Sequence, residues 1–205
     1  MHTCQAQQLP QGAHLDGGNQ RQQHLLTLYL LRHAKSDWSD HSLADAMRPL
    51  STRGRRDAQR LASFLESAHI HPDLVLCSTA ARTRETLEAV SGALGGARIE
   101  LEEGLYGASA EALLDRLAAV PDTVNSVMLI GHNPGLQALA LRLTKPGKKR
   151  ALLEAKFPTA ALAIIEPPTT SWRKLVPSSS RLSGYTTPRR LPRPIPESAP
   201  KTGLE

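Results

Sequence analysis

The chain contains little cysteine, few aromatic residues and no long hydrophobic run. Two cysteines among 205 residues, Cys4 and Cys77, are too few for a disulfide scaffold or a zinc site. An aromatic content of 3% argues against a surface that stacks nucleic-acid bases. No apolar run approaches the roughly 18 residues of a membrane span, and no basic start leads into the apolar core of a signal peptide. We therefore expect a cytoplasmic protein with reduced thiols, no membrane partner and no nucleic-acid partner.

Acidic residues are outnumbered, and 25 Lys and Arg against 19 Asp and Glu give a formal net charge of +6. Residues 177–205 hold five basic and two acidic residues, and residues 1–24 hold one of each. Half of the excess therefore lies near the C-terminus, and residues 25–176 are only mildly basic. A mild positive field attracts anionic substrates, but it is weak evidence for nucleic acid.

The two ends of the chain differ in composition from its middle. Residues 1–24 are rich in Gln, Gly and His, and residues 177–205 contain six prolines among Ser, Thr and Arg. Such segments bury too little apolar surface to offset the entropy lost on ordering. We expect a disordered extension over residues 1–24, a single domain over residues 25–176 and a disordered tail over residues 177–205.

The middle of the chain alternates short apolar runs with helical patterns. Apolar runs typical of strands occupy residues 28–31, 74–76, 98–101, 127–130 and 160–166, with a possible edge strand at 172–176. Helical spacing with suitable caps occupies residues 52–68, about 79–94, 110–119 and 134–144, and residues 148–150 read as a loop. This alternation predicts an α/β fold, in which helices flank a mostly parallel central sheet.

Basic side chains follow three of the predicted strands. Arg32 and His33 end the first run, Arg82 lies in the first turn of the helix after the second strong run, and His132 follows the third. Ligands of open α/β sheets bind beyond the carboxyl ends of the strands, so we expect these side chains to meet. Two guanidiniums and two imidazoles suit a dianionic phosphate, with one imidazole available as a nucleophile. A metal site is the rival interpretation, but no acidic or thiol partner accompanies the histidines.

Each of these residues also has an ordinary interpretation. Arg32 could cap a strand, Arg82 could be a solvated helix residue, and His132 could be satisfied near a turn. Their occurrence together at matching positions is less expected by chance, which favours a site.

Four motifs occur in a fixed order along the chain. Residues 28–38 read LYLLRHAKSDW, residues 48–54 RPLSTRG, residues 77–86 CSTAARTRET, and residues 131–136 GHNPGL. In this order and spacing they resemble the histidine phosphatase (phosphoglycerate mutase-like) superfamily. The sequence RHA followed by KSDW resembles its small phosphohistidine phosphatase branch. The resemblance covers about residues 27–175.

The resemblance implies a role for each matching residue. His33 would be the nucleophile that becomes transiently phosphorylated. Arg32 and Arg82 would hold the phosphoryl oxygens, and His132 would complete the phosphate pocket.

The match to the family is looser at two other positions. The family's proton donor is an acidic residue after the third strand, and Glu103 is the best match, with Glu102 beside it as an alternative. Ala34 stands where the family more often has Gly, which we interpret as a trait of the branch.

The resemblance implies a metal-independent phosphatase that forms a phosphohistidine intermediate and needs no cofactor. The favoured substrate is phosphohistidine in a protein partner, as in signalling, because the compact chain has no long insertion to form a lid over a small substrate. One alternative is a phosphatase or mutase for a small phosphorylated metabolite. Another is a non-catalytic phosphate- or nucleic-acid-binding module.

Overall fold

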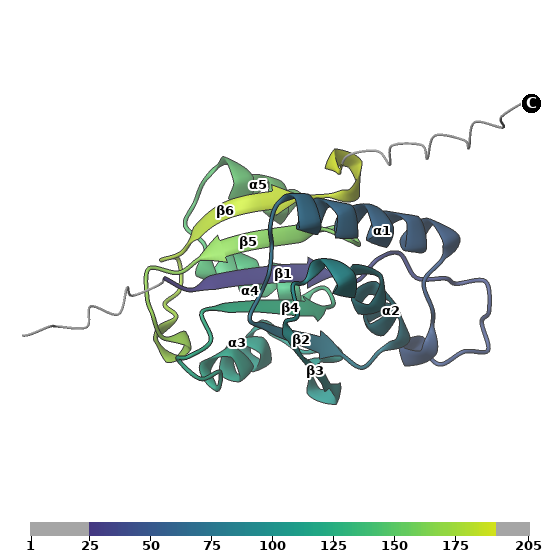
Figure 1. The fold of residues 1–205 in the computed structure, drawn as a ribbon, viewed down its shortest axis with the longest axis horizontal. Helices are drawn as coiled ribbons and strands as arrows, with labels where there is room; N and C mark the ends of the chain where they lie inside the picture. Colours follow the sequence, from purple (N-terminus) through teal and green to yellow (C-terminus); the bar gives the residue numbers. More distant parts are fainter. Residues whose placement is uncertain (1–24, 192–205) are drawn as a thin grey trace, which may run out of the picture.

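A six-stranded sheet forms the middle layer of the molecule, with helices on both faces (Figure 1). The computed structural model describes residues 25–191. The strand order is β3-β2-β4-β1-β5-β6. The first four strands in this order run parallel, β5 runs antiparallel to β1, and β6 runs antiparallel to β5. The predicted single-domain α/β fold with a mostly parallel sheet is confirmed.

The elements follow one another as the sequence patterns predict, with small shifts at their ends. The strands are β1 Thr27–Arg32, β2 Leu74–Ser78, β3 Arg98–Glu102, β4 Ser126–Gly131, β5 Leu162–Glu166 and β6 Arg181–Thr186. The α-helices are α1 Thr52–Ser67, α2 Ala81–Val90, α3 Ala110–Ala118, α4 Gly135–Leu143 and α5 Lys148–Ala155. The short 3-10 helices are η1 Asp45–Met47, η2 Ser91–Ala93, η3 Glu103–Leu105, η4 Trp172–Lys174 and η5 Pro188–Arg190.

The strand β1 separates two apolar layers. Leu28 and Leu30 are fully buried in the layer that includes α3, α4 and α5. Leu31 is fully buried in the opposite layer, together with Leu61 of α1 and Leu87 of α2. Burial of an aliphatic side chain contributes about 1.5–3 kcal/mol, so both layers fix β1 firmly in the sheet. The residues that follow β1 are thereby held in a fixed place.

The fold continues further along the chain than the sequence predicts. Residues 181–186, expected in a disordered tail, form the edge strand β6, and Leu182 and Tyr185 pack against the core. The domain end at residue 176 is therefore wrong. Residues 178–187 are free of proline and can form a ladder, although prolines flank them on both sides. Residues 1–24 and 192–205 lie outside the described residues.

Two other expectations need correction. Residues 172–176 form no edge strand, because η4 buries Trp172, whose Nε1 donates to the Val124 carbonyl at 2.7 Å. Residues 148–150 begin α5 and not a loop, and Leu153 of that helix is buried against the core. Within residues 25–191, no helix is long and apolar enough to cross a membrane.

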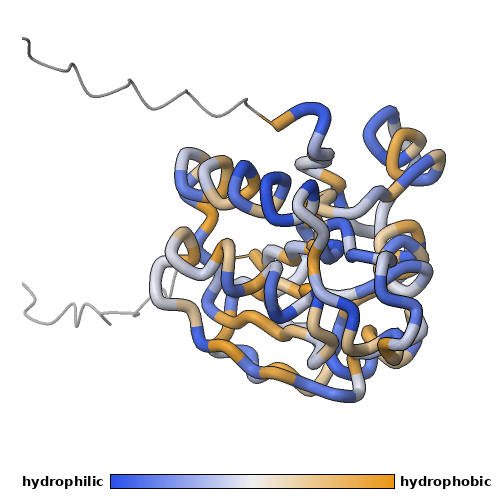
Figure 2. Tube along the Cα trace, turned by 90° about the vertical axis from the view of Figure 1, so that its right-hand side faces the viewer, coloured by the Kyte–Doolittle hydropathy of each residue, from blue (hydrophilic) through white to orange (hydrophobic). Residues whose placement is uncertain are grey.

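The carboxyl ends of β1, β2 and β4 lie side by side. Arg32 is opposite Gly131, and Cys77 is opposite Ile130. The connection from β1 to α1 extends from this end of the molecule, at the right of Figure 1, and Figure 2 views the molecule from that end. The residues that follow these three strands therefore share one end of the sheet.

Candidate active site

Three strand ends bring the predicted basic residues together. Arg32 ends β1, His33 follows it, Arg82 lies in the first turn of α2, and His132 follows β4. The ring centroids of His33 and His132 are 5.2 Å apart. His33, Arg82 and His132 are each less than 10% exposed. The structure thus forms one compact cluster from residues that lie up to a hundred positions apart in the sequence.

The hydrogen bond of His33 fixes its tautomer. Its Nδ1 lies 2.7 Å from the carbonyl oxygen of Ala34. A carbonyl oxygen can only accept, so Nδ1 carries the proton and Nε2 keeps its lone pair. Burial lowers the pKa of His33 to about 3, against the opposing effect of the Ala34 carbonyl and with further lowering by the neighbouring His132 ring and by the charges of Arg82 and Arg32. At neutral pH the ring is therefore uncharged, with Nε2 available as a nucleophile.

Thr86 connects the turn after His33 to helix α2. The Ala34 N–H donates to Thr86 Oγ1 at 3.0 Å, and Thr86 Oγ1 donates to the Arg82 carbonyl at 2.6 Å. The Ala34 methyl group is fully buried in a small cluster with Leu50, Ala58 and Ala160. This packing explains how an alanine is accommodated at position 34.

The two arginines are anchored in different ways. The Arg32 Nη1 donates to the Phe157 carbonyl at 2.8 Å, while its Nε is buried without a partner in the described structure. The Arg82 Nη1 donates to the backbone oxygen of Asp45 at 2.6 Å, and its Nη2 donates to the Asp45 carboxylate Oδ2 at 2.9 Å. Arg82 also contributes to a lowered pKa of Arg32, after the larger effect of burial. Two guanidiniums held close together favour a bound anion between them.

Asp45 and Tyr106 are site residues that sequence reasoning missed. The Tyr106 hydroxyl donates to Asp45 Oδ2 at 2.7 Å, and its ring meets the His132 ring edge-on with centroids 5.4 Å apart. The Tyr106 hydrogen bond, followed by the contact with Arg82, holds the pKa of Asp45 below its usual range. Asp45 is thus a carboxylate at neutral pH. The buried Arg82 needs a counter-charge, and Asp45, in the loop before the RPL motif, is a candidate that the sequence itself offers.

His132 is buried to about the same extent as His33 and Arg82. Its Nε2 lies 2.9 Å from Ser78 Oγ, and its Nδ1 is buried with no partner in residues 25–191. Burial and the positive charge of Arg82 lower the pKa of His132 to about 4, against the opposing effect of Asp45. His132 is therefore neutral near pH 7 and keeps one unused ring nitrogen.

Comparison with known proteins places the chain in a family. The model of the histidine phosphatase superfamily (branch 1) matches residues 28–111. An uncharacterized protein of Mycobacterium tuberculosis is 37% identical over 163 residues, which are 78% of this chain and all of that protein. The "putative phosphohistidine phosphatase SixA from Agrobacterium tumefaciens" is 32% identical with a TM-score of 0.67, over 79% of this chain and 98% of that one. The chain belongs to the histidine phosphatase superfamily, branch 1. The "Putative Phosphohistidine Phosphatase SixA from Nakamurella multipartitia" has 29% identity and a TM-score of 0.69, over 80% of this chain and 96% of that one.

The two acidic candidates for the histidine phosphatase proton donor lie differently. Glu103 begins η3 and is exposed, and its side chain makes no hydrogen bond or ion pair with the described residues. Both carboxylate oxygens of Glu102 accept from the Arg116 Nε at 2.9 Å, which ties Glu102 to α3. Glu103 is therefore without a side-chain partner among the described residues, whereas Glu102 is held by Arg116.

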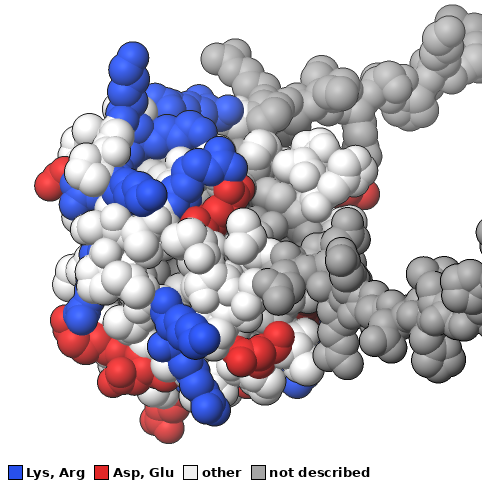
Figure 3. Space-filling model, turned by 90° about the vertical axis from the view of Figure 1, so that its left-hand side faces the viewer, with Lys and Arg blue, Asp and Glu red and all other residues white. Residues whose placement is uncertain are grey.

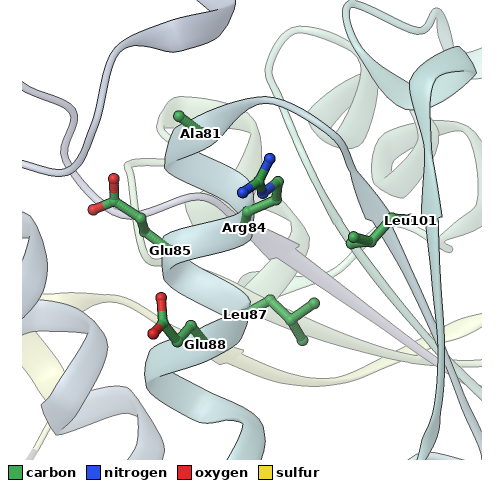
Figure 4. Close-up of a pocket in the computed structure, with 6 residues that line it drawn as sticks. All are labelled: Ala81, Arg84, Glu85, Leu87, Glu88 and Leu101. Carbon is green, nitrogen blue, oxygen red and sulfur yellow. The ribbon is translucent and has the colours of Figure 1, made fainter.

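Two further features bear on the chemistry available. Within residues 25–191, no group of three or more His, Cys, Asp or Glu side chains could hold a metal ion. A hollow of about 290 Å³ lies beside α2 and β3, and Figure 4 shows Arg84, Glu85 and Leu101 among its lining residues. None of the four basic residues of the cluster lines this hollow, so it is separate from the candidate active site.

Proposed function

We propose that this protein is a metal-independent phosphatase that forms a phosphohistidine on His33 and dephosphorylates phosphohistidine in a protein partner. The observation that carries the proposal is the state of His33. Its ring is neutral and buried, its Nε2 lone pair is free, and two guanidiniums lie beside it. A cationic histidine in this place could not attack phosphorus.

The proposed reaction has two displacements at phosphorus. His33 Nε2 bonds to phosphorus while the bond to the leaving imidazole nitrogen breaks, and that nitrogen keeps the electron pair while the other nitrogen of the leaving ring holds a proton taken from solvent. Water then attacks the phosphohistidine, releases a proton to solvent and expels neutral His33. Arg32, Arg82 and His132 donate hydrogen bonds to the equatorial oxygens, where negative charge is spread in both transition states.

The surroundings of the cluster support a substrate carried on a protein. Trp38, Met47 and Tyr106 are 52%, 64% and 40% exposed, and Met47 and Tyr106 adjoin Asp45 at the site. Large exposed apolar side chains beside a reactive cluster are typical of contact with a macromolecule. Between β1 and α1 the described structure has only one helix, the short η1, so this connection does not include a long helical insertion over the site. A phosphoryl group on a folded partner could therefore reach His33.

The leaving group also favours a phosphoramidate. An imidazole can be protonated by solvent before it leaves, so its departure makes a weak demand on a general acid. Glu103, which is exposed and unpartnered in the described structure, is the proposed donor where an ester substrate needs a proton.

On the face opposite to the candidate active site, seen in Figure 3, Lys and Arg are interspersed with Asp, Glu and neutral side chains. That face gives no support to a nucleic-acid-binding module.

One comparison tests the proposal. The purified protein, in EDTA, is assayed for phosphate release from a phosphohistidine-bearing protein and from a panel of small phosphate esters. We expect the phosphohistidine protein to give the higher kcat/KM, and His33→Ala to remove turnover while the far-UV spectrum stays unchanged.

The exposed His41 of the β1–α1 connection offers a matched control, since His41→Ala should keep full activity. Turnover by folded His33→Ala above a few per cent would remove His33 as the nucleophile. Higher kcat/KM on a metabolite ester would replace the proposed substrate class.

A further inference from the structure

Ser78 lies beneath the candidate site and has no part in the proposed function so far. It is the last residue of β2 and is fully buried. Its Oγ lies 2.9 Å from His132 Nε2 and also accepts from the Ala80 N–H at 3.4 Å. The hydroxyl group therefore touches the one nitrogen of His132 that has a partner.

The positions of the hydrogens follow from what each group can do. A backbone N–H only donates, so Ala80 occupies a lone pair of the Ser78 oxygen. The hydroxyl hydrogen of Ser78 then needs an acceptor, and within the described structure its hydrogen bonds offer His132 Nε2 alone. A proton on Nε2 would leave that buried hydroxyl hydrogen unpaired, which is unfavourable. Ser78 is thus the donor and Nε2 the acceptor.

The other nitrogen of His132 must then carry the ring proton. Neutral imidazole has one N–H, and Nε2 is an acceptor, so the proton is on Nδ1. This Nδ1 is the buried nitrogen that has no partner in residues 25–191. Because the His132 ring lies 5.2 Å from the His33 ring, a phosphoryl group on His33 is the nearest acceptor that the reaction would provide.

We propose that Ser78 is a positioning residue that holds His132 as its Nδ1–H tautomer, so that Nδ1 donates to an oxygen of the phosphoryl group. The inference rests on the proposed function for the identity of the anion. Without Ser78, neutral His132 can place its proton on either nitrogen, and the site then presents a lone pair to the phosphoryl oxygen for part of the time. An acceptor facing an anion weakens binding and slows transfer.

Ser78 has a close control in the same turn. The Thr83 hydroxyl is also fully buried and contacts the Ser78 and Ala80 carbonyl oxygens at 2.7 and 2.6 Å. No hydrogen bond joins it to His132 within the described structure. Thr83→Val therefore removes a buried hydroxyl from the same turn and keeps the Ser78–His132 contact.

The tautomer can be read without any enzymatic assay. In protein labelled with 15N at histidine, the two ring nitrogens of His132 give different chemical shifts when protonated and unprotonated. We expect the wild-type protein and Thr83→Val to show a protonated Nδ1 at pH 7. Ser78→Ala should shift both resonances toward a mixture of tautomers, and Ser78→Thr, which keeps a hydroxyl, should restore the wild-type pattern.

Inorganic phosphate supplies the second readout. In Ser78→Ala the Nδ1–H form is only part of a tautomer mixture, so the affinity for phosphate should fall by the inverse of its population, about 2- to 10-fold, with Thr83→Val unchanged. A protonated Nε2 in the wild-type protein would overturn the proposal, whether or not any variant folds. Unchanged tautomer and phosphate affinity in folded Ser78→Ala would also overturn it. An Nδ1–H tautomer that depends on Ser78 in a protein inactive on phosphohistidine would refute the proposed function alone.

Discussion

His33 and His132 must stay neutral among positive charges for the proposed chemistry to work. Arg82 is within electrostatic reach of both rings, and it acts with burial to lower both pKa values. The same guanidinium that would hold the phosphoryl oxygens thus keeps the nucleophile unprotonated. Asp45 limits this effect at His132, because its negative charge acts in the opposite direction.

The pH dependence of kcat/KM reports this arrangement at the residue scale. Protonation removes the Nε2 lone pair of His33, so activity is lost as pH falls through the pKa of the free protein. With the pKa of His33 lowered to about 3 and that of His132 to about 4, activity should persist at pH 5.5. A histidine with the ordinary value of about 6.5 would be mostly protonated there. The measurement is kcat/KM on an aryl phosphate from pH 4.5 to 8, corrected for titration of the substrate. A loss of kcat/KM on the acidic side centred near pH 6.5 would contradict the lowered pKa of these two histidines.

Asp45 is also tested at the residue scale. Asp45→Asn keeps the shape of the side chain but replaces the carboxylate that accepts from Arg82 and Tyr106. Arg82 then loses a charge-assisted hydrogen bond that sets its orientation, and we expect about a tenfold weaker affinity for inorganic phosphate.

The control for this change is Asp40→Asn, because Asp40 is exposed and accepts only from Ser42 among the described residues. Calorimetric titration of both variants with phosphate separates the two positions. Tighter binding in Asp45→Asn would show that the carboxylate repels the anion more than it orients Arg82.

At the scale of elements, helix α1 packs directly on the turn that carries the nucleophile. A Cβ atom at Gly54 would lie 2.0 Å from the Lys35 carbonyl oxygen, so only glycine allows this approach. The same oxygen accepts from the Ser51 N–H at 2.9 Å and from the Ser51 hydroxyl at 3.0 Å. The N-terminus of α1 is thereby bonded to a residue two positions after His33.

Gly54→Ala should therefore reduce both stability and activity. Alanine forces α1 and the turn apart, which we expect to cost about 1–3 kcal/mol of unfolding free energy and to displace His33. Gly92→Ala is the matched control, since a Cβ at Gly92 meets nothing within 4 Å. Urea denaturation and turnover are measured for both variants. If Gly54→Ala matched Gly92→Ala in both measurements, the contact would have no part in placing the turn.

At the scale of the whole molecule, the strands and the residues that follow them could be predicted, because each buried strand is a continuous apolar run and its flanking residues are its neighbours in the sequence. The apolar run before Arg32 and the one before His132 predict the sheet and its reactive end. The role of Ser78 was not predictable, because it depends on a contact with a residue 54 positions away. That of Asp45 could at most be suggested by the need for a counter-charge near Arg82, which lies 37 positions away. A serine before a helix reads first as a cap, and only the fold shows that its hydroxyl meets an imidazole. β6 was missed for a related reason, since its partner β5 supplies the ladder that its own composition does not suggest.

The contribution of β6 gives a prediction for the molecule as a whole. A chain ending at residue 176 loses the strand, leaves the ladder groups of β5 unpaired and exposes the core beneath Leu182 and Tyr185. Two partly buried side chains and several hydrogen bonds together contribute about 3 kcal/mol. For a domain of this size, that loss lowers the melting temperature by about 6–12 °C.

The control ends at residue 191 and keeps β6 and η5. Leu191 is buried, and its carbonyl accepts from Arg60 of α1, so this end point preserves the last described contact with the domain. We expect the chain of residues 1–191 to melt as the full chain does, because the remaining proline-rich residues carry no apolar pattern. Thermal unfolding at equal concentration compares the three chains, and sedimentation detects pairing through the exposed β5 edge. Equal melting temperatures for the chains ending at 176 and 191 would show that the sheet is complete without its sixth strand.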